Sequence, residues 1–209
     1  MNKLSTTYLG LELKHPIVAS ASPQSRTLDG IRRLEDAGAS AIVLFSLFEE
    51  QIRYEQDTLE FMIGSTSNAS PEALSYFPTR ADFEVGPGDY LELVNKASKA
   101  TDIPIIGSLN GVTDAGWIDY AKDIVEAGAK ALELNVYLLP LDLTQTGEEV
   151  ERRYVQILET VKKAVKVPVA VKLSPFFSST GNMAKRLAKA GAAGLVLFNR
   201  FYQPDFDIE

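Results

Sequence analysis

The stretch AGASAIVLFS at residues 37–46 has two near copies further along the chain, AGAKALELN at 127–135 and AGAAGLVLFN at 190–199. Each copy contains a glycine typical of a helix end, followed by a short apolar strand and then a small polar residue. Three runs that contain an early proline alternate with these copies: HPIVAS at 15–20, IPIIGS at 103–108 and VPVAVK at 167–172. The alternation predicts six successive units, each a strand followed by a helix.

The predicted strands are apolar throughout, which is typical of a parallel sheet covered by helices on its faces. We expect them at 17–21, 41–45, 103–108, 131–135, 168–173 and 195–198, after a β-hairpin within 4–14. Amphipathic spacing predicts helices over 25–37, 90–101, 114–127 and 148–165. A short helix is expected at 182–190, and some helix is expected within 49–62, in the least regular part of the sequence. No strand is followed by a Gly-x-Gly-x-x-Gly motif, so a dinucleotide-binding doubly wound sheet is disfavoured.

The fold class expected from this pattern is α/β, a (β/α)8 barrel formed by a single domain over residues 1–209. Strands that alternate between two sequence types suit a barrel whose alternate strands pack in separate layers. A complete barrel has eight units and the pattern supplies six. We therefore expect an incomplete barrel that lacks its last two units.

Composition excludes several classes of function. The net charge is −7 and the pI is about 4.9, which disfavours binding to nucleic acid or to an anionic membrane. The chain has no cysteine, so disulfides, thiolate metal ligands and a cysteine nucleophile are excluded. No signal peptide or membrane-spanning run is visible, and we expect a cytoplasmic protein.

The active site of a (β/α)8 barrel lies at the carboxyl ends of its strands. Here those ends carry small polar residues and one lysine: Ser20, Ser22, Ser46, Ser108, Asn135, Lys172 and Asn199. The only histidine, His15, precedes the first strand and falls at the opposite end. No pair of carboxylates is predicted at the strand ends. Zinc chemistry, a histidine-based triad and glycoside hydrolysis are therefore disfavoured, and no metal site is expected.

Lys172 has three interpretations. It can form an ion pair with Glu133 on the neighbouring strand, it can be a Schiff-base nucleophile, or it can place a charge beside the reactive ring of a cofactor. Asn135 and Asn199 can cap loop backbone or contact a ligand. Ser20 and Ser22 can shape the turn before Pro23 or contact a ligand.

Four elements of the sequence together resemble the dihydroorotate dehydrogenase family: HPIVASASP at 15–23, ALELN at 131–135, VPVAVKLSP at 167–175 and Asn199. Members of that family are FMN-containing (β/α)8 barrels, and the similarity runs along essentially the whole chain. The resemblance implies an FMN-dependent oxidoreductase acting on CH–CH bonds, as in the oxidation of dihydroorotate to orotate in pyrimidine biosynthesis. It also implies a small pyrimidine-like substrate, with a homodimer as one assembly to test.

The resemblance assigns roles to residues at the strand ends. The flavin would contact Ser20, Ala21, Ser22, Ser46, Ser108, Asn135 and Lys172. The positive charge of Lys172 would lie near the pyrimidine edge of the flavin and stabilise its reduced form. The substrate would contact Asn135 and Asn199.

The sequence departs from the family at three places. Leu138 occupies the position at which the family has a Cys or Ser base, so no catalytic base is assigned. Phe45 and Ser46 stand where the family has a lysine beside Ser or Thr, and the glycine-rich phosphate loops of strands seven and eight are not found. Two alternatives therefore remain open, a Schiff-base lyase that uses Lys172 and a non-catalytic degenerate barrel.

Overall fold

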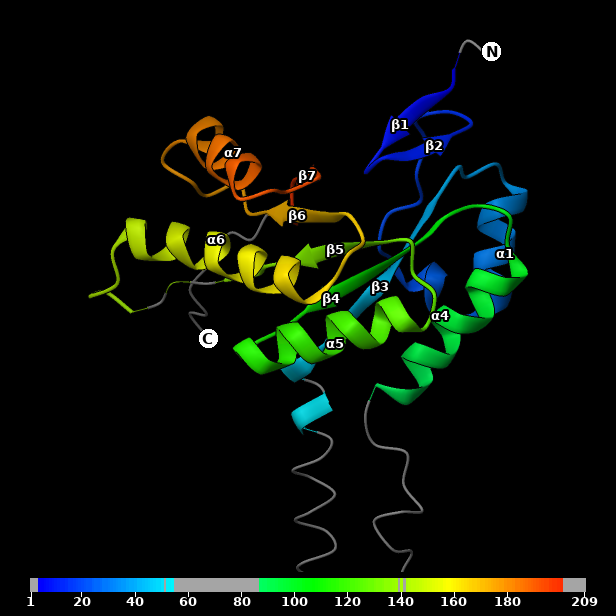
Figure 1. Cartoon of the computed structure of the whole chain (residues 1–209), viewed down its shortest axis with the longest axis horizontal. Helices are drawn as coiled ribbons and strands as arrows, with labels where there is room; N and C mark the ends of the chain where they lie inside the picture. Colours follow the sequence, from blue (N-terminus) through cyan, green and yellow to red (C-terminus); the bar gives the residue numbers. More distant parts are fainter. Residues whose placement is uncertain (1–3, 51, 55–86, 139, 141, 201–209) are drawn as a thin grey trace, which may run out of the picture.

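A computed structural model describes residues 4–50, 52–54, 87–138, 140 and 142–200 of the chain, and Figure 1 shows its arrangement. The strands are β1 (Thr6–Tyr8), β2 (Leu11–Leu13), β3 (Ile42–Phe48), β4 (Ile105–Asn110), β5 (Ala131–Asn135), β6 (Val169–Leu173) and β7 (Gly194–Leu197). The helices are η1 (Pro23–Arg26), α1 (Leu28–Asp36), α4 (Gly88–Ala100), α5 (Asp114–Glu126), α6 (Gly147–Ala164) and α7 (Thr180–Lys189).

The central sheet is parallel and its strands follow the order of the sequence, β3-β4-β5-β6-β7. A helix connects each strand to the next, as the alternation predicts. The predicted hairpin is present as the antiparallel pair β1–β2. Over the described residues the sheet is curved but does not close on itself (Figure 1), so the α/β architecture is confirmed as an open part of a barrel.

The first predicted strand, at 17–21, is not a regular strand. It is reduced to an isolated parallel bridge between Ala19 and Ile42. The Ala19 N–H donates to the Ala41 carbonyl at 3.0 Å and the Val43 N–H donates to the Ala19 carbonyl at 2.8 Å. The segment thus lies along the edge of β3. The Ile17 N–H donates to His15 Nδ1 at 3.3 Å instead of to a neighbouring strand, and Pro16 has no N–H to donate, so the ladder does not extend toward the start of the chain.

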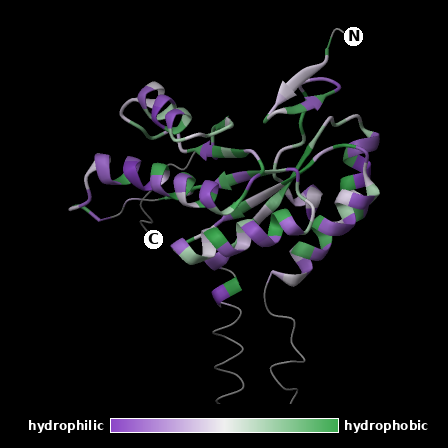
Figure 2. Ribbon diagram, viewed as in Figure 1, coloured by the Kyte–Doolittle hydropathy of each residue, from purple (hydrophilic) through white to green (hydrophobic). Residues whose placement is uncertain are grey.

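The two faces of the sheet pack against different partners because successive side chains of a strand point to opposite sides. One face packs against the helices through large residues such as Leu132, Leu134 and Val171. The other face packs against the hairpin through smaller residues, including Ala131 and Ala170. Figure 2 shows mixed hydrophilic and hydrophobic residues along the covering helices, as expected for helices with one buried face.

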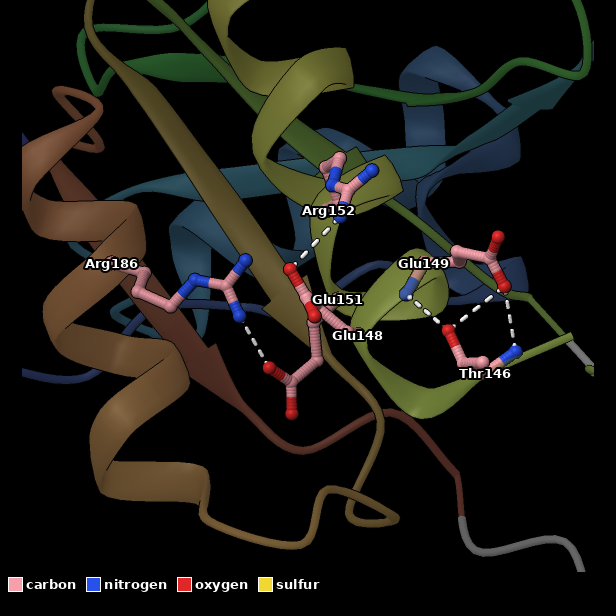
Figure 3. Close-up of polar contacts among 6 residues, drawn as sticks. All are labelled: Thr146, Glu148, Glu149, Glu151, Arg152 and Arg186. Carbon is pink, nitrogen blue, oxygen red and sulfur yellow. Dashed lines mark hydrogen bonds and ion pairs between the residues drawn. The ribbon is translucent and has the colours of Figure 1, made fainter.

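Helix α6 begins with a capping box. The Thr146 hydroxyl accepts a hydrogen bond from the Glu149 N–H at 3.3 Å, and the Glu149 carboxylate accepts one from the Thr146 N–H at 2.7 Å (Figure 3). Two residues after Glu149, Glu151 forms an ion pair with Arg186 of α7. These contacts fix the start of α6 and join it to the helix that precedes β7.

Part of the predicted helix at 49–62 can be assessed. Residues 49, 50 and 52–54 are helical, and the remaining predicted positions lie outside the described residues. In the part of the chain that the structure describes, none of the helices has the length and apolar character needed to cross a bilayer.

Candidate active site at the carboxyl ends of the strands

The face of the sheet toward the hairpin changes from apolar to polar along each strand. On β5 this face presents Ala131, then Glu133, then Asn135, and on β6 it presents Ala170 and then Lys172. Register brings the polar positions together, because Ser108 pairs with Glu133, and Asn135 pairs with Lys172. The polar residues therefore gather at the carboxyl ends of the strands, as the sequence predicts.

Four of the predicted residues form a continuous hydrogen-bonded chain across the sheet. The Asn199 amide donates to Asn135 Oδ1 at 2.7 Å, and the Asn135 amide donates to Ser46 Oγ at 3.3 Å. Ser46 Oγ lies 2.8 Å from Ser108 Oγ. Because Ser46 accepts from Asn135, its own proton is free to be donated to Ser108. These hydrogen bonds join residues up to 153 positions apart in the sequence, and they hold both asparagine side chains in defined orientations.

A bulge in β3 places Ser46 where it can join this series of hydrogen bonds. Val43 pairs with Ile106 and Ser46 pairs with Ser108. Between these two pairs β3 contains one more residue than β4, which is a β-bulge. Tyr90 of α4 supports the neighbouring backbone, since its hydroxyl donates to the Ser108 carbonyl at 3.1 Å and accepts from the Ser108 N–H at 3.0 Å. The Phe45 ring, within the bulge, packs edge-on against Tyr90 with centroids 5.0 Å apart.

Lys172 and Glu133 form a largely buried ion pair. Lys172 Nζ lies 2.6 Å from Glu133 Oε1, and the two side chains are 13% and 4% exposed. The ion-pair interpretation of Lys172 is thus confirmed. The contact lacks hydrogen-bond geometry, so among the described residues Glu133 Oε1 is buried without a hydrogen-bond partner. Burial and the charge of Glu133 both raise the pKa of Tyr8, which reaches this region from the hairpin.

Lys172 lies between two cavities, each of about 370 Å³. The first, which we call the mouth cavity, is at the carboxyl ends of the strands. Its lining residues are Ala21, Ser22, Pro23, Arg26, Phe45, Ser46, Phe48, Asn135, Lys172, Phe198, Asn199 and Arg200. The second is largely apolar and lies under the hairpin, with Tyr8, Ser20, Glu133 and Lys172 in its wall.

The predicted site residues are therefore divided among several environments. Ala21, Ser22, Ser46, Asn135, Lys172 and Asn199 line the mouth cavity. Ser20 lines the hairpin cavity instead. Ser108 is fully buried, and it reaches the mouth cavity only through Ser46.

The loop after β5 differs from the arrangement expected from the resemblance. Leu138, predicted at the position of the base, packs against the core and lines a separate cavity beside α6. Its neighbour Tyr137 lines a smaller cavity of about 300 Å³ together with Asn135 and Asn199. Sequence reasoning missed Tyr137 and Arg26. The position of Arg26 shortly after the first predicted strand, on the side where barrel active sites lie, was the available signal.

Three curated proteins are similar in sequence to this chain, at low identity. The catalytic subunits of dihydroorotate dehydrogenase B (NAD(+)) from Methanocaldococcus jannaschii, Bacillus thuringiensis and Anoxybacillus flavithermus are 26%, 27% and 28% identical to it. The alignments cover 94%, 100% and 100% of this chain and 62%, 65% and 65% of the relatives. The chain resembles dihydroorotate dehydrogenases. It spans less than two thirds of the length of these relatives.

Comparison with solved structures supports the fold. A phosphonopyruvate hydrolase in complex with oxalate and Mg²⁺ matches 91% of this chain and 61% of its own, with a TM-score of 0.53 and 16% identity. A second structure of phosphonopyruvate hydrolase matches with a TM-score of 0.52 and 13% identity. Phosphonopyruvate hydrolase is a (β/α)8 barrel, and at this identity the likeness concerns the fold alone. No protein-family model matches the chain.

Proposed function

We propose that this chain forms the flavin-binding and substrate-binding part of an FMN-dependent oxidoreductase that acts on a CH–CH bond of a pyrimidine-like ring. The observation that carries the proposal is the convergence of Lys172, Asn135 and Asn199 on the mouth cavity. The resemblance to dihydroorotate dehydrogenases supports the same chemistry. The proposed reaction is the oxidation of dihydroorotate to orotate, and the proposed location is the cytoplasm.

The residues of the mouth cavity fit FMN. Phe45, Phe48 and Phe198 supply apolar surface for a ring system, while Lys172 supplies a cation. A pocket of about 370 Å³ lies within the range of roughly 300–1,000 Å³ that small-molecule sites occupy. When bound, FMN would supply the redox chemistry by accepting two electrons from the substrate.

The asparagine side chains would orient a ring that bears carbonyl groups. Each side-chain amide has two N–H donors. One N–H of Asn199 is donated to Asn135, and one of Asn135 is donated to Ser46. Each therefore retains one N–H for a ligand, which matches the carbonyl oxygens of a pyrimidine. Because the two amides are fixed by each other, little rotamer entropy is lost when the ligand binds.

Lys172 would act electrostatically. Its side chain is largely buried on the inner face of the sheet, where a fixed charge interacts more strongly than in water. Glu133 holds it at a defined position on the floor of the cavity. The role proposed for the lysine is to stabilise negative charge that develops on the bound ring.

The test is flavin binding by the purified chain. We expect absorbance of bound flavin, or its appearance on titration with FMN, and photoreduction or chemical reduction of the bound flavin. Lys172→Ala should slow reduction by dihydroorotate by at least about 10-fold, whereas Lys166→Ala, at an exposed lysine before β6, should have no effect. A chain that binds no flavin under any of these conditions would refute the proposal. Borohydride trapping of a carbonyl compound on Lys172 would instead support the lyase alternative.

A further inference from the structure

Arg26 is held in place at the edge of the mouth cavity by the loop that carries it. The short helix η1 ends at Arg26, and its buried Ser25 anchors it by donating from Oγ to the Ser22 carbonyl at 2.9 Å. On its other side, η1 packs closely against α1. A Cβ atom added at Gly30 would lie 2.1 Å from the Gln24 carbonyl oxygen. The backbone that carries Arg26 is thus fixed from two directions.

The guanidinium group of Arg26 is also positioned by an aromatic ring. Its Cζ lies 5.3 Å from the centroid of the Phe45 ring, a cation–π distance. Phe45 is itself fixed edge-on against Tyr90 at the bulge of β3. Both Arg26 and Phe45 line the mouth cavity. The bulge thus has two effects. It points the Ser46 side chain toward the mouth cavity, and it places the Phe45 ring where Arg26 contacts it.

The mouth cavity carries an excess of positive charge. Its wall contains Arg26, Lys172 and Arg200, and none of the described residues that line it is acidic. Lys172 is neutralised by Glu133. No carboxylate of the described part of the chain forms an ion pair with Arg26 or Arg200. This concentration of uncompensated cations contrasts with the net charge of −7 of the whole chain.

We infer that the mouth cavity binds an anionic group of its ligand and that Arg26, stacked on Phe45, is the residue that recognises it. A guanidinium group presents parallel N–H donors that match the two oxygens of a carboxylate or phosphate. Among the described residues no carboxylate is paired with the Arg26 guanidinium, so its N–H donors are available for these hydrogen bonds. The inference rests on the proposed function only for the molecule that carries the anion, which is either the phosphate of FMN or a carboxylate of the substrate.

Two pairs of probes separate these sources in calorimetric titrations of the full chain. FMN is compared with riboflavin, which lacks the phosphate, and orotate is compared with uracil, which lacks the carboxylate. We expect the wild-type chain to prefer the anionic member of at least one pair by 10-fold or more. Arg26→Ala should remove that preference without changing the affinity for the neutral member.

Matched variants control for indirect effects. Arg32→Ala removes an exposed arginine from α1 and should keep the preference. Arg26→Lys keeps the charge but loses the paired donors, so it should restore part of the preference. Phe45→Leu should weaken it by removing the platform. Thermal melting of each variant shows that the fold is kept.

The results have distinct meanings. Loss of preference only in the flavin pair assigns Arg26 to the phosphate, and loss only in the pyrimidine pair assigns it to a substrate carboxylate. A wild-type chain with no preference in either pair, or an Arg26→Ala chain that keeps it, overturns the inference. If neither flavin binds but orotate is preferred over uracil through Arg26, the inference stands while the proposed flavin function fails.

Discussion

Lys172 Nζ lies 2.6 Å from Glu133 Oε1, and this ion pair separates the apolar half of the inner face of the sheet from its polar half. The two residues come from neighbouring strands, and each has little contact with solvent. Either charge alone would be poorly solvated there. The pair therefore links the stability of the sheet to the charge available at the mouth cavity.

Removing one member of this pair should be more harmful than removing both. Glu133→Gln leaves the Lys172 ammonium buried without a counter-charge and should lower the free energy of unfolding by about 3–5 kcal/mol. The double variant Glu133→Leu with Lys172→Met should be close to neutral in stability. Urea unfolding measures both. The control is Arg33→Ala, which removes an exposed pair with Asp29 and should cost less than about 1 kcal/mol. Equal costs at the buried and exposed pairs would contradict this prediction.

The Tyr90 hydroxyl should stabilise the sheet measurably. Tyr90→Phe removes the two hydrogen bonds to the Ser108 backbone, at 3.0 and 3.1 Å, in a buried position. The expected loss is about 2–3 kcal/mol in the free energy of unfolding. Tyr54→Phe is the matched control, because that side chain is 73% exposed and should change stability by less than about 0.5 kcal/mol. A Tyr90→Phe chain as stable as the control would show that the backbone finds other partners.

Glu49 should make stability depend on acid pH. Its buried carboxylate accepts from the Val112 N–H, the Thr113 N–H and the Thr113 hydroxyl, at 2.6, 3.0 and 2.7 Å. Burial alone would raise the pKa, but these hydrogen bonds and Arg53 outweigh it and lower the pKa below the ordinary 4.5. The contribution to stability is thus complete above pH 4.5 and is lost as the pH falls through the lower folded-state value.

The measurement is unfolding free energy against pH. Glu49→Gln should reduce stability by about 2 kcal/mol at pH 7, and the difference from wild type should shrink as the pH is lowered below 4.5. Glu50→Gln changes the exposed neighbouring carboxylate and should leave the profile unchanged. A difference between wild type and Glu49→Gln that stays constant from pH 7 to pH 3 would refute the assignment.

Two glycines near helix starts should respond in opposite ways to alanine. Gly30→Ala places a Cβ 2.1 Å from the Gln24 carbonyl oxygen, so η1 must move, and we expect a loss of about 1–3 kcal/mol. Gly147, the first residue of α6, has open space around its Cβ position. Gly147→Ala should be neutral or stabilising, because alanine has the higher helix propensity. Thermal unfolding of both variants distinguishes these outcomes, and equal effects would argue against the close packing of η1 on α1.

Sequence periodicity was sufficient for most of the architecture. Five of the six predicted strands are present in the predicted order, because short apolar runs between amphipathic helices bury their side chains when they pair side by side in a parallel sheet covered by those helices. The run at 17–21 has the same local pattern but forms only a bridge at Ala19. Whether an edge segment becomes a regular strand depends on neighbours distant in sequence, here β3.

The sequence was sufficient to predict which residues form the site, but not how their side chains are arranged. The position of Asn135, Lys172 and Asn199 at or just beyond the ends of apolar strands determined that they would meet at the carboxyl ends, since the strands are parallel. The phase of β3 and the place of Arg26 were decided only by the tertiary structure. A one-residue bulge brings Ser46 onto the inner face and places the Phe45 ring beside Arg26, and that ring packs against Tyr90, 45 residues away along the chain. Local sequence encodes which side chains alternate along a strand, whereas long-range packing decides where that alternation is interrupted.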